Sequence, residues 1–249
     1  MQNLSEESAQ LAPLQTFDPN AFVGNHEVPQ NICSFVLALA LVYNDCKNGM
    51  FSNLLLADFK PVGNPKTSRA WGAYSGIKFH YIRLHLGLLH ELFKLIEENR
   101  DAIQHSFFNS VIKLLPRRAR GSWHDLVAAS LGRGTSSPLG KTLLMVRNKV
   151  AFHYDCKEIY RGYRKHFFRN GNMIESAFVS RGASMRRSRL YFADAAVGGY
   201  FQSQFDRRQV DEFMKRVADI TGDLNRAIIL IVDRFIQKRG YAYQDYKET

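Results

Sequence analysis

The sequence predicts an all-α protein, and three observations support that prediction. Apolar residues recur every three or four positions along several long segments, which is the period of a helix with one buried face. The chain has 249 residues, of which 45% are hydrophobic and 12% aromatic, so it can bury a sizeable core. It contains no internal repeat and no low-complexity segment. Such helices pack as a bundle, and we expect one helical domain over residues 29–240.

The two ends of the chain are expected to lie outside this bundle. Residues 1–28 carry Pro13 and Pro19 among scattered polar residues, so we expect a flexible arm that is poorly ordered or wraps over the surface. The first residues are acidic and lack the basic start and apolar middle of a secretory signal. Residues 241–249 are polar and aromatic and are expected to form a C-terminal tail.

The first helix is expected from about residue 32 to residue 48. It contains the longest apolar run, residues 35–43, which has about half the length needed to cross a bilayer. The polar pair Asn44-Asp45 ends this run, so the sequence predicts a buried helix and no membrane span. A short apolar patch at 51–59 follows, and then a loop at 61–65 with two prolines.

A long helix is predicted from Ile77 onward, because apolar residues continue at helical spacing as far as Leu95. It is expected to break or bend near residues 98–100. A further helix carries Phe107 and ends where Pro116 removes a backbone donor. The segments expected next are a basic stretch at 117–121, a short helix over about 122–131 and a flexible loop at 132–138.

The next helix is expected to begin at Ser137 or Pro138. Four apolar side chains share one face of this helix: Leu139, Leu143, Val146 and Val150. The helix could continue through Tyr160 and Tyr163. Asn170-Gly171-Asn172 predicts a turn. Residues 173–205 are harder to assign, with short strands or helix fragments expected at 177–179 and 190–192.

The last helix has the clearest pattern in the chain. Apolar residues follow the helical period from Val210 to Phe235, and Asp206 is a plausible N-cap. Gly240 lies just past the expected end, where a glycine commonly terminates a helix.

Charge and motif spacing narrow the function. The formal net charge is +11 and the sequence pI is about 9.7, which favours a polyanionic partner such as RNA or DNA. The three cysteines fit reduced thiols in a cytosolic protein. The eight histidines and the cysteines lack metal-ligand spacing, so we expect neither a metal nor another cofactor. Neither a P-loop nor a Gly-x-Ser-x-Gly elbow occurs.

One segment, residues 147–155, brings together groups suited to phosphate chemistry. Arg147 is followed at once by the polar Asn148, and His153 comes five residues later, with apolar residues on either side. An arginine can hold a phosphate through its planar fork of donors, and a histidine can transfer a proton near neutral pH.

This segment resembles the signature of the HEPN superfamily, whose members are all-helical nucleotide- and RNA-binding domains. In that motif an Arg is followed by four to six residues and a His, with Asn, Asp or His favoured directly after the Arg. Arg147-Asn148-x4-His153 fits the motif, and residues 143–146 and Phe152 are similar to the family's motif helix. Arg100-Asp101 and His105 also fit both the spacing and the polar second position, but they lie where the long helix is expected to break.

The resemblance implies a HEPN-type bundle with additional helices, and metal-independent cleavage of RNA. The 2′-hydroxyl attacks the adjacent phosphorus and leaves a 2′,3′-cyclic phosphate and a 5′-hydroxyl. His153 would be the general base or acid, Arg147 would stabilise the phosphorane and Asn148 would orient the phosphate. Lys149 and Tyr154 are further candidates for contacts to RNA. Family members of this kind include toxins and antiviral defence effectors that a regulatory or antitoxin protein holds inactive.

Helical geometry adds an expectation about assembly. Six residues of a helix span about 9 Å of rise and about 120° of net rotation, so Arg147 and His153 do not lie side by side on a straight helix. They can converge in a groove, at a bend or across a dimer interface. The family commonly uses the last arrangement, and we expect a homodimer in which the motif helices face each other.

Basic side chains further along the chain could bind the RNA that such a cleft would cut. Arg161, Arg164 and Lys165 are interleaved with Tyr160, Tyr163 and Phe167, a mixture suited to phosphate contact and base stacking. The alternative is a non-catalytic helical module that binds RNA, nucleotide or protein.

Overall fold

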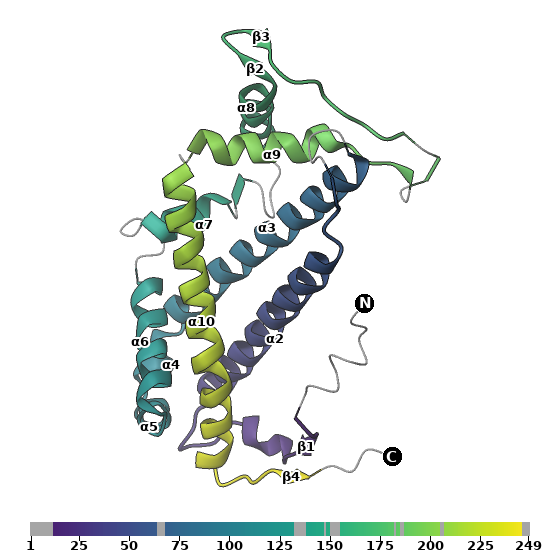
Figure 1. Ribbon diagram of the computed structural model, residues 1–249. Coiled ribbons are helices and arrows are strands. Elements are labelled where there is room, and N and C mark those ends of the chain that lie inside the picture. The colour runs from purple at the N-terminus through teal and green to yellow at the C-terminus, as the bar shows by residue number, and fades with distance from the viewer. Residues whose placement is uncertain are drawn as a thin grey trace. The chain divides into compact units, whose positions relative to one another are not determined.

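The computed structural model describes eight stretches of the chain, which are residues 12–63, 68–131, 138–146, 148–149, 155–181, 183–184, 187–204 and 207–245. The all-α prediction is confirmed: the described residues form nine α-helices, one 3₁₀ helix and four strands of two residues each (Figure 1). No described helix is both long enough and apolar enough to span a membrane.

The chain divides into two compact units, each built from separate stretches of sequence. Unit 1 comprises Met1–Lys47, Glu91–Arg133 and Asp219–Thr249, and unit 2 comprises Asn48–His90 and Gly134–Ala218. Three long helices, α2 (Gln30–Asp58), α3 (Arg69–Glu98) and α10 (Arg207–Lys238), contribute residues to both units.

Unit 1 holds the short helices and a core of aromatic rings. Its helices besides parts of the long ones are η1 (Pro19–Phe22), α4 (Arg100–Gln104), α5 (Ser106–Lys113) and α6 (Arg117–Ser130). Phe35 from α2 meets Phe108 from α5 and Trp123 from α6, with centroid distances of 5.5 and 6.4 Å. All three rings are almost fully buried.

The described part of the N-terminal arm packs on unit 1. Strand β1 (Gln15–Thr16) pairs antiparallel with β4 (Gln244–Asp245), and the two lie side by side in Figure 1. The ring of Phe22 stacks on Phe235 at 5.4 Å, and Ala21 and Val28 are buried. Residues 12–28 therefore lie over the surface of unit 1 and pack on it through Ala21, Phe22 and Val28.

Unit 2 adds helices α7 (Pro138–Val146), α8 (Cys156–Phe167) and α9 (Tyr191–Gln204) to the long ones. Helices α8 and α9 cross closely because glycines meet at the crossing. A Cβ atom at Gly199 would overlap the carbonyl oxygen of Gly162, and a Cβ at Gly162 would overlap the backbone of Ala196 and Tyr200. Only glycine at these two positions allows the helices to approach this far.

A short β-hairpin with a two-residue turn follows α8. Strands β2 (Phe168–Arg169) and β3 (Asn172–Met173) pair antiparallel around Asn170 and Gly171. Both turn residues have positive φ, 50° and 84°, as a type I′ turn requires. The predicted Asn-Gly turn is confirmed.

Several helix boundaries differ from the sequence predictions. Helix α2 continues to Asp58, so almost all of the apolar patch at 51–59 is helical. Helix α6 begins at Arg117, so the basic stretch at 117–121 is helical too. The helix from Pro138 does not continue to Tyr163, because Asp155 is extended (φ −71°, ψ 104°) and begins α8 as its N-cap. Tyr191 starts a helix, and residues 177–179 belong to neither a helix nor a strand.

Other boundaries agree with the predictions. Helix α3 ends at Glu98 and α4 begins at Arg100, so the predicted break near residue 99 is confirmed. At the end of α10, Gly240 has φ 82°, its N–H donates to the carbonyl of Gln237, and Tyr241 N–H donates to Ile236. These two bonds form a Schellman motif. Asp206, the predicted N-cap of α10, lies outside the described residues.

Candidate functional site

The segment that resembles the HEPN motif lies between α7 and α8, and the structure describes its flanks. Asn148 and Lys149 form a π-helical turn directly after α7, and both are partly buried. Arg147, His153 and Tyr154 lie outside the described residues. The structure therefore places Asn148, Lys149 and Asp155, while the two residues expected to do the chemistry remain predictions.

A clamp between Lys149 and Asp155 joins the two flanks. The Lys149 ammonium forms an ion pair with a carboxylate oxygen of Asp155, and the Asp155 backbone N–H donates to the Lys149 carbonyl at 3.2 Å. The hydrogen bond from Lys149 lowers the pKa of Asp155, and the same bond raises the pKa of Lys149. The pair is therefore ionised on both sides around neutral pH.

Asp155 also fixes the start of α8. Its other carboxylate oxygen accepts from the N–H groups of Lys157 and Glu158, at 3.1 and 3.2 Å. This is an N-cap, and it satisfies two of the donors that a helix start leaves without partners. One carboxylate thus connects the motif segment to the helix that carries the basic side chains.

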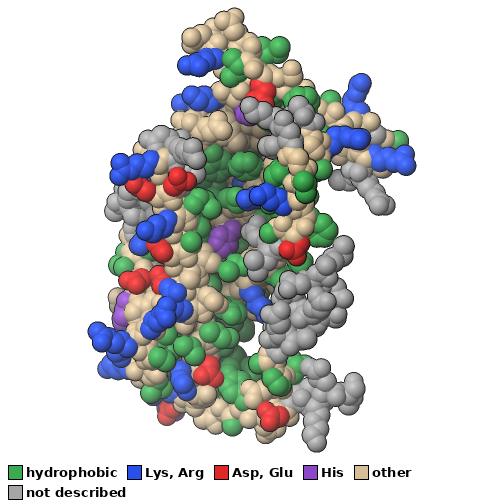
Figure 2. Space-filling model, in the orientation of Figure 1, with side chains coloured by type: hydrophobic (Ala, Val, Ile, Leu, Met, Phe, Trp, Pro, Cys, Tyr) green, Lys and Arg blue, Asp and Glu red, His purple; other side chains and the backbone are tan. Residues whose placement is uncertain are grey.

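The basic side chains predicted to bind RNA are exposed along α8. Arg161, Arg164 and Lys165 all point to solvent. Arg161 lies 3.8 Å from Glu158, and the Arg164 guanidinium lies over the Phe168 ring at 6.0 Å. In Figure 2 basic and acidic side chains are both seen around α8 and the hairpin, as they are along α10.

Two of the aromatic side chains of α8 pack inside the protein, and a third lies on its surface. Phe167 is 3% exposed and its ring lies 4.8 Å from that of Tyr163, so both belong to packing. Tyr160 is 61% exposed and could stack on a base. Tyr200 of α9 lies beneath this helix, where burial and the nearby carboxylates of Glu158 and Asp155 raise its pKa to about 12.

The competing Arg100-Asp101 and His105 spacing has structural roles instead. His105 ends α4, and its Nδ1 accepts from the Phe107 N–H at 3.2 Å, which caps α5. Arg100 lies 3.7 Å from Glu97 on the preceding helix. These contacts account for both side chains and favour residues 147–153 as the site.

Sequence reasoning missed a cavity in unit 2. It has a volume of about 270 Å³ and lies among α3, α8, α9 and the segment at 175–178. Two ion pairs border it: His166 Nε2 lies 3.4 Å from Glu175, and Arg189 lies 2.8 Å from Asp194. The Arg189–Asp194 pair rests on the backbone of Gly76, where a Cβ atom would clash with both side chains.

No periodic signal could have located this cavity, since its walls come from three distant parts of the chain. The available hint was compositional: residues 173–205 contain both aromatic and charged residues, and neither a helical nor a strand period is clear there.

Comparisons with known proteins returned no match. No protein-family model, no curated protein and no solved structure is significantly similar to this chain. Among the described residues no cluster of three His, Cys, Asp or Glu side chains could hold a metal ion.

Proposed function

We propose that this protein is a metal-independent endoribonuclease in which Arg147, Asn148 and His153 cleave RNA through a 2′,3′-cyclic phosphate. The observation that carries the proposal is the interruption of the helix at the motif. The π turn at 148–149 and the extended backbone of Asp155, the N-cap of α8, show that the helical backbone at 148–149 does not continue straight into α8, although the Lys149–Asp155 clamp joins the two. A break of the helix between Arg147 and His153 would lift the constraint that keeps the two side chains apart on a straight helix.

Charge supports RNA as the substrate. The chain carries a net charge of +11, and Arg161, Arg164 and Lys165 are exposed on the helix that the clamp joins to the motif. A chain threaded past the motif would meet phosphate-binding groups within one helix length. In this mechanism His153 moves the proton and Arg147 stabilises charge on the phosphorus, which needs no metal.

The direct test is cleavage of single-stranded RNA in the presence of EDTA by wild-type protein and by His153→Ala and Arg147→Ala variants. We expect wild type to leave 2′,3′-cyclic phosphate ends, and each variant to lose about 10²–10⁴-fold in rate. His105→Ala is the matched control, because it removes the histidine of the competing spacing. Its cleavage rate should match wild type, with only a modest loss of stability from the missing cap.

The assay also separates the proposal from its alternative. RNA that is bound but uncut by wild type would favour a non-catalytic binding module. Cleavage that continues undiminished in both variants would reject Arg147 and His153. Growth arrest on expression of wild type, but not of the variants, is the expected outcome for a toxin or defence effector.

We also propose that the active form is a homodimer with the two motifs facing one cleft. Mixing His153→Ala with Arg147→Ala protein tests this, since a shared cleft can combine the intact Arg of one chain with the intact His of the other. Partial recovery of cleavage is expected. A mixture as inactive as its components would contradict a shared cleft.

A further inference from the structure

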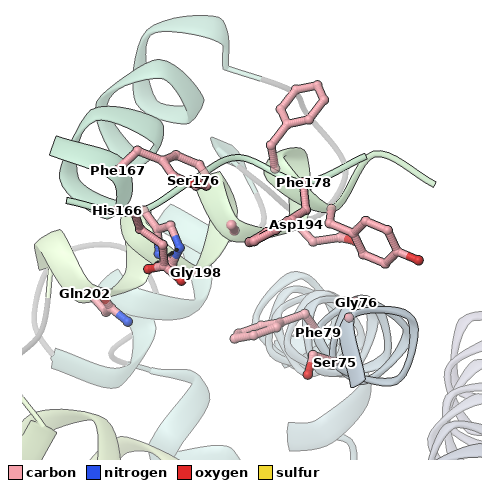
Figure 3. Close-up of a pocket in the computed structure, with 15 residues that line it drawn as sticks. Ser75, Gly76, Phe79, His166, Phe167, Ser176, Phe178, Asp194, Gly198 and Gln202 are labelled. Atoms are coloured by element: carbon pink, nitrogen blue, oxygen red, sulfur yellow. Dashed lines mark ion pairs between the residues drawn. The ribbon is translucent and has the colours of Figure 1, made fainter. Parts of the chain in front are cut away.

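The cavity in unit 2 is suited to a flat aromatic ligand. The rings of Phe79, Phe178 and Tyr191 contribute to its lining from three different segments. In Figure 3 the ring of Phe79 extends from α3 into the open space opposite His166 and Gly198. Aromatic walls on separate elements allow a planar ring to stack between them, as bases do in proteins that bind single-stranded RNA.

The lining includes two carboxylates, which only accept hydrogen bonds, beside the side chains of Ser75, His166 and Ser176, which can both donate and accept. Glu175 and Asp194 present carboxylates, and the exposed Gln202 adds an amide at the rim. A carboxylate can accept several hydrogen bonds, so Glu175 can bind His166 and a ligand donor together. Such a lining favours a ring that carries N–H donors on its edge.

Size limits the ligand further. At about 270 Å³ the cavity falls just below the range of about 300–1,000 Å³ that is typical of sites for drug-sized molecules. Among its lining residues Gly76 and Phe167 are buried, whereas Glu175 and Phe178 are about half exposed. A single ring system can enter, and whatever is attached to it would remain outside.

We propose that this cavity binds one nucleobase that carries an exocyclic amino group, with the base stacked on Phe79 and its amino group donating to Glu175 or Asp194. Adenine, cytosine and guanine offer such a donor, and uracil does not. The inference deepens the proposed function and depends on it only in taking RNA as the polymer to which the base belongs. It would give the nuclease a preference for RNA sequence.

Titration of the wild-type protein with AMP, CMP, GMP and UMP by calorimetry tests the proposal without depending on cleavage. A mononucleotide has no internucleotide bond, so binding is measured whether or not the protein is a nuclease. We expect at least one amino-bearing nucleotide to bind about tenfold or more tightly than UMP, because uracil has no exocyclic amino group and its base can donate only through N3–H. Inorganic phosphate is the competitor, and it should not displace the nucleotide.

The chain offers a matched pair of blocking and control variants. A Cβ atom at Gly198 meets only the Phe79 ring, at 3.8 Å, so Gly198→Leu should fold and fill the cavity. Gly49 lies on a helix of the same unit with nothing within 4 Å of its added Cβ, so Gly49→Leu makes the same change elsewhere. Gly198→Leu should weaken nucleotide binding at least tenfold, and Gly49→Leu should leave it unchanged.

Each contrary result has a definite meaning. The proposal is overturned if no nucleotide binds at millimolar concentration, if UMP binds as well as the others, if phosphate displaces the nucleotide, or if Gly198→Leu binds like wild type. Loss of cleavage in His153→Ala together with absent nucleotide binding would retain the nuclease and reject the base site. Nucleotide binding in a protein that never cleaves RNA would retain the base site and reject the nuclease.

Discussion

In unit 1 the helices meet through large buried rings, whereas in unit 2 helices α8 and α9 meet through glycine backbone. Phe108 of unit 1 has no exposed surface and contacts both Phe35 and Trp123. At the α8–α9 crossing, by contrast, Gly162 and Gly199 leave no room for a side chain. Most of the apolar side chains that are fully buried in the described part of the chain belong to unit 1.

This difference suggests that unit 1 mainly stabilises the fold and that unit 2 carries the candidate binding groups. A dense apolar core stabilises but offers no space and few polar groups to a ligand. Unit 2 contains the clamp, the exposed basic helix and the cavity, and it positions them with caps, ion pairs and close backbone contacts. Binding sites are expected in such regions, where concave space and polar groups occur together. The comparison predicts that mutations will affect the two units in different ways.

The largest effect is expected for Phe108→Ala in unit 1. Removal of a fully buried ring leaves a cavity among Phe35 and Trp123, and we expect a loss of about 3–5 kcal/mol in the free energy of unfolding. Urea unfolding measures the loss. Phe59→Ala, at a ring that is 57% exposed, should change stability by less than about 0.5 kcal/mol. Equal losses at both positions would show that the rings of unit 1 are not its main support.

A smaller but sharper effect is expected for Gly199→Ala in unit 2. The added methyl group would overlap the Gly162 carbonyl, and backbone cannot rotate aside as a side chain can. We expect a loss of about 1–3 kcal/mol, measured by thermal unfolding. Gly49→Ala is the control, and it should stabilise by about 0.5–1 kcal/mol because alanine favours the helix and meets nothing. If both substitutions stabilise, the close crossing is not required.

These two variants also show what the sequence could predict. The helical period revealed α3, α5 and α10, and the Phe107–Leu115 helix was expected to have an apolar face. The crossing of α8 and α9 could not be predicted, because a glycine in a helical pattern gives no information about which other helix will pack against it. The end of the motif helix was missed for a related reason. Asp155 can lie inside a helix or cap one, and the apolar period around it fits both.

The candidate site divides along the same line. The apolar pattern predicted a continuous helix through the motif, and it encoded neither the π turn at Asn148 and Lys149 nor the Lys149–Asp155 clamp. The cavity depends on residues from α3, α8 and α9 that meet only in the folded chain. Local signals such as Asn170-Gly171 and Gly240 were sufficient for turns and helix ends, since there the backbone conformation itself demands the residue.

Gly240→Ala tests that last statement in unit 1. Gly240 has φ 82° at the end of α10, a conformation that an alanine adopts at a cost of about 1 kcal/mol. We expect a loss of stability of that size, seen as a lower melting temperature. Nothing lies within 4 Å of an added Cβ at this position, so the loss reports backbone strain alone. An unchanged melting temperature would mean that the Schellman motif adds no stability to the unit.

The smallest effect concerns the clamp, and NMR titration of the Asp155 carboxyl measures it. Because Lys149 is the main cause of the lowered pKa of Asp155, Lys149→Met should raise that pKa toward the ordinary value of about 3.9. The sign follows from linkage. A carboxyl with a lowered pKa stabilises the fold above its ordinary pKa, and the contribution is lost as the pH falls through the folded value. The Asp155 carboxylate that caps α8 should therefore stay ionised to lower pH in wild type than in Lys149→Met. Lys165→Met is the control. It removes a charge from α8 without touching Asp155, so it should leave the titration of Asp155 unchanged. If the carboxyl titrates alike in wild type and Lys149→Met, the flanks of the motif are not joined by this pair.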